Sequence, residues 1–575
     1  MINKYFYNLS VTITGIITAI FILTTVGGLF HIPVNPLYVF IPFIGGLYYL
    51  KKQSAENIDF LKQFLILLLI IMFSYIISIS IWDVSWDGRW YHIASSIMYK
   101  NGWLPIYDNY ENFADLHNIY HLSAFWANCY VNFVELVGGN IYKLTGLLES
   151  TKSINFITWF SVFMYSFFVL NEFNIKNKIF PFVISLIIVL NPVCIYQVFT
   201  NYIDLHIFLS FTLLLFTIIN VELKQNASKT DLFMFICSSI MLSMTKFTGL
   251  VYLFIIYFIY FFFLILKKRK IKKFIITLSI FGLLAAITGI HPYYTNYRDY
   301  NNPFYPFVGK DKKIIVDKTS TPRQFIGKNN FEKFIISNIS ESVNSIERPI
   351  VGKMDVEIIP KIPFTKKFTS VHNYFYTADM RIGGFGYYWS GIICLMFILV
   401  FGITFRNSKE KQIFIFLILA IIVSSSINPY CWWARYVPQL WLIPVLVLFF
   451  GFIQCKYKLA FFRIIHYAVI YISILFFIYN SGIIINQNWK MNIKLSNFEK
   501  QKYSKIIKMS PKGVYLMKKP EDKLYIANES IIPHLKESVK NILYVKYDEN
   551  KIISEGYIPI QNFIIYRNYF VKPIQ

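Results

Sequence analysis

Charged residues are scarce in this chain of 575 residues. They make up 15% of the composition, whereas residues of the set AVILMFWYC make up 56%. A soluble protein of this length could not cover its surface with so few charges, because charged side chains supply much of a solvated surface. The composition therefore excludes a string of ordinary soluble domains and predicts a polytopic membrane protein.

Other common signals are also missing. The six cysteines lie far apart and form no CxxC pair, so the sequence predicts neither a disulfide framework nor a cysteine metal site. We find no glycine-rich phosphate loop and no repeat of about 20–50 residues. Acidic residues are few, with 31 Asp and Glu against 56 Lys and Arg and a net charge of +25. In a membrane protein this excess first indicates topology and not nucleic-acid binding.

What the chain has instead is long apolar stretches. A spanning helix needs roughly 20 mostly apolar residues. We expect an all-α polytopic membrane protein with about 13 transmembrane helices. The first stretch is too long for a signal peptide and lacks a small-residue cleavage site. The predicted spans are 10–30, 34–50, 62–82, 154–171, 178–191, 205–221, 231–246, 249–266, 274–290, 389–405, 411–427, 437–454 and 463–486.

The short loops between these stretches alternate in charge. Every second short loop is rich in Lys and Arg, and the opposite loops have almost none. By the positive-inside rule the N-terminus is cytoplasmic, and thirteen spans then place the C-terminus outside. The basic loops are those near 51–62, 176–178, 224–229, 267–273, 406–411 and 456–463.

Three long segments fall on the outer side of this predicted topology. A transmembrane domain, 1–486, contains a first large outer loop at 83–153 and a second at 291–388. The remaining segment, 487–575, has an amphipathic pattern near 497–509 and then short apolar runs separated by Pro, Asp and Asn. That pattern predicts a small extracytoplasmic α/β domain.

Two carboxylates stand out just after the third predicted span, in the sequence IWDVSWDGRWYH at 81–92. Aromatic residues are common at a membrane interface, but Asp83 and Asp87 among them are less expected. One interpretation is a carboxylate base at the membrane surface, with His92 nearby. The alternative is a solvated helix end at which Arg89 is a counter-ion.

Four more outer residues are candidates for substrate binding. Asp204 opens a span, where the helix dipole alone also favours a carboxylate. Lys246 lies at a tight outer turn, against the positive-inside bias, although it is also explained as a snorkelling Lys. Arg298 follows the ninth span. Arg435 is the only charge in 428–436, and it suits either a bidentate grip on phosphate or simple stacking on Trp.

These polar groups share one side of the predicted topology. Six separated segments place them at span ends, while the spans themselves contain few ionisable residues. Ion-coupled transporters usually need carboxylates near the midplane, so this pattern argues against that class. It favours a reaction at the outer membrane surface. Three further glycines, in DMRIGGFGYYW at 379–389, permit close backbone approach there.

Several of these segments, in this order, resemble motifs of the GT-C superfamily of membrane glycosyltransferases. The segments are WDGRWYH at 86–92, KFTGL at 246–250, HPYYTNYRDYNNPFYP at 291–306, RIGGFG at 381–386 and WWARYVPQ at 432–439. In two respects the chain departs from the superfamily. Its acidic outer loop follows the third span and not the first, and it lacks a WWDYG-like acceptor motif, which argues against sequon glycosylation.

The resemblance implies an inverting transfer of a hexose or pentose from a polyprenyl-phosphate sugar. The acceptor would be a hydroxyl on a glycan, lipid or protein at the outer face of a bacterial cytoplasmic membrane. A sugar phosphate already has a good leaving group, so one base for the acceptor and cations for the phosphate suffice.

We therefore expect Asp87, or second Asp83, to be the base. Arg435 and Lys246 would bind phosphate, and Asp204 would orient the acceptor or the base region. His92 and Arg298 are further substrate-binding candidates. No metal-ligand spacing is visible and no cofactor is expected, although carboxylates can hold a divalent cation.

Three other functions remain open from the sequence. One is a polymerase or ligase of lipid-linked polysaccharide, which would show Arg-rich outer loops without an early acidic requirement. Another is a flippase or exporter of lipid-linked glycans, which would show charges lining an intramembrane cavity. The last is a membrane scaffold whose outer domains bind a partner.

Overall fold

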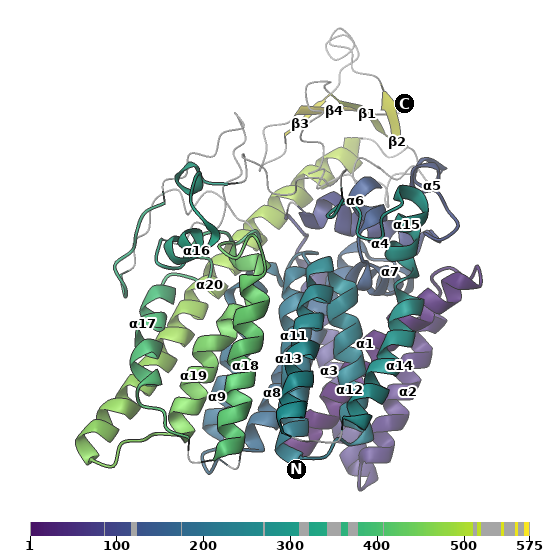
Figure 1. The fold of residues 1–575 in the computed structure, drawn as a ribbon. Coiled ribbons are helices and arrows are strands. Elements are labelled where there is room, and N and C mark those ends of the chain that lie inside the picture. Colours follow the sequence, from purple (N-terminus) through teal and green to yellow (C-terminus); the bar gives the residue numbers. More distant parts are fainter. Residues whose placement is uncertain are drawn as a thin grey trace.

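The chain forms a bundle of long helices with shorter helices at one end and a small sheet beyond them, in a computed structural model (Figure 1). The residues that the structure describes run from 2 to 573 with internal breaks. The breaks are at 86, 117–123, 174, 268–270, 310–320, 342–357, 366–377, 406, 510–513, 519–541, 546–557 and 562–567.

Each of the thirteen predicted stretches falls on a helix. These helices pack side by side in the bundle, with α1 against α8 and α11 against α12 (Figure 1). They are α1 (Ile2–Leu29), α2 (Leu37–Gln53), α3 (Asn57–Ser80), α8 (Ser153–Asn171), α9 (Ile179–Val189), α11 (Asp204–Lys224), α12 (Lys229–Thr245), α13 (Phe247–Leu266), α14 (Lys272–Thr288), α17 (Trp389–Val400), α18 (Ser408–Ser426), α19 (Leu442–Ile453) and α20 (Ala460–Met509).

Far fewer of these helices are long and apolar enough to cross a membrane alone. Among the described residues six satisfy both conditions, or seven if α14 and the bent helices after it, at 64°, count as one span. The helical membrane fold is therefore confirmed, but thirteen full spans are not supported. Helix α9 shows why: it has 11 residues and ends before Asn191, which caps the new helix α10 (Pro192–Gln197).

The basic loops meet at one end of the bundle. Lys267 lies 3.1 Å from Glu222, and Lys409 donates to the carbonyl oxygen of Leu223 at 2.6 Å. Lys224 lies over the ring of Tyr7, near the start of α1. The loops that are basic in the sequence thus lie together at one end of the helical bundle.

The predicted first outer loop, 83–153, contains several helices in its described part, which the sequence did not indicate. Its helices α4 and α7 pack closely at Gly139. A Cβ added at this glycine would lie only 2.8 Å from the Cβ of Tyr99, so the close approach needs a residue without a side chain. The elements of this segment are η1 (Gly88–His92), α4 (Ile93–Lys100), α5 (Tyr110–Leu116), α6 (Ala124–Cys129), α7 (Phe133–Thr145) and η2 (Leu148–Lys152).

The remaining short elements lie at the same end of the bundle as this segment (Figure 1). The glycine-rich turn before α17 is tied to α20, since Asn480 donates to Phe385 O at 2.9 Å and accepts from Tyr388 N at 3.0 Å. The elements are η3 (Ile290–Tyr294), α15 (Thr295–Tyr300), η4 (Arg323–Phe325), α16 (Asn330–Asn338), η6 (Ala434–Tyr436) and η7 (Pro438–Trp441).

The last helix runs across the predicted domain boundary. Helix α20 has 50 residues and continues through the predicted boundary at 486/487 and through the predicted amphipathic helix at 497–509. At about 1.5 Å per residue it is roughly 75 Å long, more than twice the thickness of a bilayer core. It therefore extends well beyond the other helices, toward the sheet (Figure 1).

The segment after α20 contains four short strands. They form one mixed sheet in the order β2-β1-β4-β3, in which β1 pairs parallel with β2 and antiparallel with β4. The segments between the strands lie outside the described residues, so the complete α/β domain stays a prediction. The strands are β1 (Val514–Lys518), β2 (Ile542–Val545), β3 (Ile558–Gln561) and β4 (Asn568–Pro573).

Thiol labelling tests the predicted orientation. In a background without native cysteines, Lys52→Cys and Lys409→Cys should be shielded from an impermeant maleimide in intact cells. Asn330→Cys, at the opposite end of the bundle, should be labelled. Labelling at 52 with protection at 330 would invert the topology.

Candidate functional site

A buried arginine lies where several segments meet at the end of the bundle opposite the basic loops. In Arg435, Nη1 is 2.7 Å from Asp87 Oδ2 and 3.7 Å from Asp204 Oδ2. Its Nε is 2.8 Å from Asp379 Oδ1. The three carboxylates come from the segment after α3, the start of α11 and the segment before α17, so residues far apart in sequence meet around one guanidinium.

Two more cations balance the acidic side of this cluster. Lys246 Nζ is 2.6 Å from Asp204 Oδ1, and Arg381 donates to Asp379 Oδ2 at 2.8 and 2.9 Å. Burial alone would lower the pKa of Arg435, but Asp379, Asp87 and Asp204 outweigh it and raise that pKa well above its ordinary value. We call these six residues the Arg435 cluster.

Close backbone packing fixes the positions of Lys246, Arg381 and Arg435. Lys246 has an extended backbone between α12 and α13. The helices approach so closely there that a Cβ on Gly249 would lie 2.0 Å from the carbonyl oxygen of Leu242. The segments of Arg381 and Arg435 are also joined, since Ala434 N donates to Arg381 O at 3.2 Å. The glycine and WWARY motifs are therefore parts of one site.

Aromatic rings surround the cations. The guanidinium carbon of Arg435 lies 5.1 Å from the centre of the Tyr202 ring and 5.2 Å from those of Trp433 and Tyr436. Lys246 Nζ is 4.5 Å from the centre of the Tyr436 ring. Cation–π contacts of this kind stabilise charges that are partly removed from water. Arg435 thus stacks on aromatic rings, as one interpretation of its sequence expected, and it also forms ion pairs with carboxylates of the chain; a grip on phosphate stays a prediction.

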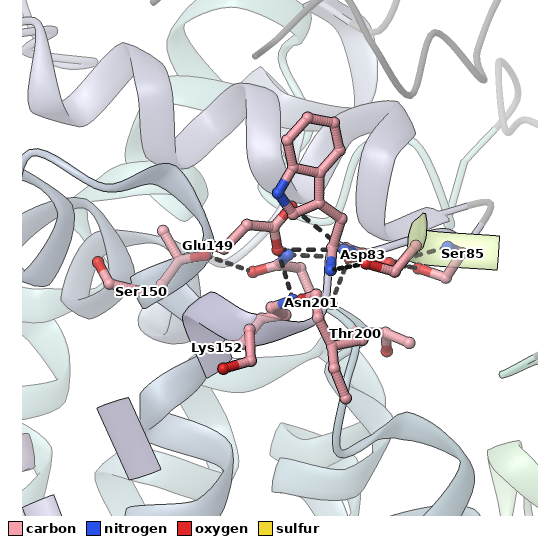
Figure 2. Close-up of polar contacts among 12 residues, drawn as sticks. Asp83, Ser85, Glu149, Ser150, Lys152, Thr200 and Asn201 are labelled. Carbon is pink, nitrogen blue, oxygen red and sulfur yellow. Dashed lines mark hydrogen bonds and ion pairs between the residues drawn. The ribbon is translucent and has the colours of Figure 1, made fainter. Parts of the chain in front are cut away.

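Asp87 and Asp83 have different surroundings. The side chain of Asp87 is 16% exposed, and its backbone N–H donates to the Tyr202 hydroxyl at 3.3 Å. Asp83 is buried, and its carboxylate accepts four hydrogen bonds of 2.6–2.8 Å, two from Ser85 and two from Asn201 (Figure 2). These bonds occupy about all the lone pairs of a carboxylate. Asp83 is therefore poorly placed to take a proton from a substrate.

The Asp83 network joins three segments of the chain. Asp83 N donates to Glu149 at 3.1 and 3.2 Å, and Glu149 pairs with Lys152 (Figure 2). Thr151 donates to the Asn201 side chain at 2.8 Å. Because Asn201 precedes Tyr202, which contacts both Asp87 and Arg435, the network fixes the wall of the Arg435 cluster.

His92 and Arg298 lie apart from the Arg435 cluster. His92 Nδ1 contacts Glu135, and both side chains are buried where α4 packs on α7. Arg298 is exposed, pairs with Asp299 at 2.6 and 3.0 Å and donates to the carbonyl oxygen of Ile106 at 2.6 Å. The structure thus groups four of the seven predicted site residues, namely Asp87, Asp204, Lys246 and Arg435.

Sequence reasoning missed Asp379 and Arg381, because only the glycines of their segment were considered. The available signal was an acid and a base two residues apart, immediately before a span. In the part of the chain that the structure describes, no group of three or more His, Cys, Asp or Glu side chains could hold a metal ion. Each of the three clustered carboxylates is instead engaged by a cation.

Comparisons with protein-family models, curated proteins and solved structures find no match to this chain. The likeness to GT-C enzymes therefore rests on its sequence motifs alone.

Asp83→Asn should destabilise the fold. The substitution replaces an acceptor oxygen by an amide donor that faces the donors of Ser85 or Asn201, which should cost about 1–3 kcal/mol. Thermal unfolding of the detergent-purified protein measures this effect. Asp299→Asn, at an exposed pair, is the control and should leave stability near wild type. Equal midpoints for Asp83→Asn and wild type would contradict the structural role of Asp83.

Proposed function

We propose that this protein is a membrane glycosyltransferase that moves a sugar from a polyprenyl-phosphate donor to a hydroxyl acceptor at the outer end of its helical bundle. The observation that carries the proposal is the pairing of a partly exposed carboxylate, Asp87, with a buried arginine, Arg435. Four of the five segments that resemble GT-C motifs contribute a residue to the cluster around this pair, namely Asp87, Lys246, Arg381 and Arg435. The pair offers a base and a phosphate ligand side by side.

The transfer itself needs three events. The acceptor oxygen attacks the anomeric carbon, the bond from that carbon to the phosphate oxygen breaks, and the acceptor proton leaves. Asp87 takes the proton, and Arg435 stabilises the charge left on the phosphate. Attack from the side opposite the leaving phosphate inverts the anomeric centre.

Arg435 must exchange partners for this mechanism. Its planar fork suits two phosphate oxygens, and a charge-assisted hydrogen bond to phosphate resembles the one it now donates to Asp87. When the donor phosphate takes the Nη1 position, the Asp87 carboxylate becomes available to the acceptor. The donor would therefore prepare the base by binding.

The other members of the cluster support this exchange. Lys246 and Arg381 add positive charge around the phosphate position. Asp204 and Asp379 keep those cations in place while Arg435 changes partners. Asp83 acts on the site through Asn201 and Tyr202, and His92 and Arg298 have no role in the transfer step.

The proposal includes a cellular placement. The protein would be a multi-pass, GT-C-like protein of a bacterial cytoplasmic membrane. Its N-terminus would be cytoplasmic, and the shorter apolar helices would complete the bundle across the bilayer. The segment after α20 would form a small α/β domain outside. The acceptor would be a glycan, lipid or protein of the cell envelope.

Asp87→Asn should abolish most transfer, because Asn keeps the shape of the side chain but cannot take a proton. Loss of a general base typically costs about 10²–10⁴ in rate. The assay is transfer from a panel of radiolabelled hexosyl and pentosyl polyprenyl phosphates, in membranes that contain equal amounts of each variant. Asp299→Asn is the matched control. Wild-type turnover in Asp87→Asn would refute the mechanism and favour a flippase.

Arg435→Lys should weaken binding of the same donors about tenfold or more, because Lys keeps the charge but loses the fork. Titration of the purified variant with labelled donor measures this effect, with Arg298→Lys as the control outside the cluster. Unchanged affinity in Arg435→Lys would leave Arg435 a structural ion-pair residue.

Arg435→Ala is a poor test of donor binding, because the substitution also removes a buried charge. Arg435 is buried among three carboxylates, and removing such a cation typically costs about 3–5 kcal/mol of stability. Loss of activity in that variant would therefore not distinguish binding from folding.

A further inference from the structure

A short apolar segment, 358–365, with the sequence IIPKIPFT, lies against both α17 and α20. The ring of Phe364 lies 5.1 Å from the ring of Phe476 on α20. A Cβ added at Gly391 on α17 would lie 2.6 Å from Phe364 Cδ1, so this glycine leaves room for the ring. The two helices pack side by side (Figure 1). We call 358–365 the Lys361 segment.

Apolar side chains of the Lys361 segment are exposed. Ile362 is 73% exposed, and Phe364 is 41% exposed although its ring contacts α20. The helices beneath the segment also expose apolar side chains, since Phe397 on α17 is 68% and Leu475 on α20 is 66% exposed. In a protein with membrane-spanning helices, bilayer lipid covers a surface of this kind. The Lys361 segment therefore lies at the lipid-facing side of the bundle.

The length of α20 places this segment at the level of the lipid headgroups. Arg463 belongs to the basic loop from which α20 begins. About 20 residues later, at Ile483, the helix has advanced roughly 30 Å, which is the thickness of a bilayer core. The ring of Tyr479, just before this level, lies 5.3 Å from the ring of Tyr388. Tyr side chains are enriched at membrane interfaces, which agrees with this depth.

Lys361 brings a cation to the same level. Its Nζ is 5.7 Å from the centre of the Tyr388 ring and 5.8 Å from that of Tyr387. Lys361 is half-buried, and among the described residues no carboxylate lies within ion-pair distance of its Nζ. Burial lowers the pKa of Lys361 to about 8, and the charge of Glu341 opposes that shift only in part. An anion beside Nζ would supply the missing compensation.

We propose that Lys361 binds the phosphate of an anionic glycerophospholipid whose acyl chains lie on the exposed apolar surface of α17 and α20. A lipid phosphate fits this site better than a free phosphate, because only the lipid also covers Ile362 and Phe364. A headgroup with net negative charge fits better than a zwitterionic one, which would bring a second cation to Lys361. Among anionic lipids, glycerophospholipids are the bulk components of a bilayer. The site contains no residue of the Arg435 cluster, so the proposal does not rest on the glycosyltransferase function.

A photoreactive side chain beside Lys361 would identify the lipid. The full chain with Ile362→p-benzoylphenylalanine is reconstituted in nanodiscs of equal parts phosphatidylglycerol and phosphatidylcholine and then irradiated. Mass spectrometry of the crosslinked peptide gives the ratio of the two lipids. Phosphatidylglycerol should be enriched about fivefold, the effect expected of one Lys beside anionic lipid. Phe397→p-benzoylphenylalanine, farther along α17, should crosslink lipid without this enrichment.

Variants at Lys361 separate its charge from the location of the segment. With p-benzoylphenylalanine at 362, Lys361→Gln should abolish the enrichment, whereas Lys361→Arg keeps the charge and should retain it. Lys328→Gln, in the turn after η4, is the matched control and should leave the ratio unchanged. Three results would overturn the proposal: no lipid crosslinked at 362, no enrichment with Lys361 present, or equal enrichment in Lys361→Gln.

Two additions distinguish the source of the phosphate. An excess of inorganic phosphate should leave the enrichment unchanged, because a free anion does not cover the apolar surface. Polyprenyl phosphate at a small fraction of the phosphatidylglycerol content should also leave it unchanged. Loss of enrichment with inorganic phosphate would assign the site to a free anion, and loss with polyprenyl phosphate would assign it to that lipid. Either loss would overturn the proposal.

Discussion

The end of this bundle opposite the basic loops is organised around one buried charge. A guanidinium removed from water is stable only if nearby carboxylates and hydrogen bonds compensate for the lost hydration. Arg435 receives that compensation from Asp87, Asp204 and Asp379, which belong to three separate parts of the chain. The requirement couples the first outer segment, the start of α11 and the segment before α17. A change in any one of them alters the site that the others form.

The Asp83 network supplies the rigidity that this arrangement needs. It lies next to the cluster and is closed, with its carboxylate bonded to Ser85 and Asn201. The cluster itself is more open, since Asp87 is partly exposed and accepts from Arg435 through a single oxygen. One network is therefore suited to structure and the other to exchange of partners. Two aspartates four residues apart have different roles because their surroundings differ.

Part of this account could be predicted from the sequence. Apolar stretches predicted the helices, and the shared side of Asp87, Asp204, Lys246 and Arg435 predicted their grouping. Helix ends could not be predicted as well. Asn191 and Pro192 divide an apolar run into α9 and α10, while α20 continues past 487 although Gly482 lies shortly before that position. The role of Asp83 depends on Asn201, 118 residues later, and no local pattern reveals such a contact.

An experimental structure with a polyprenyl-phosphate sugar bound would test the central claim most directly. The account predicts donor phosphate oxygens within hydrogen-bond distance of the Arg435 guanidinium. The Asp87 carboxylate should be released from Arg435 and should face the acceptor position, on the side of the anomeric carbon opposite the phosphate. A phosphate bound elsewhere, with the Asp87–Arg435 pair still at 2.7 Å, would contradict it.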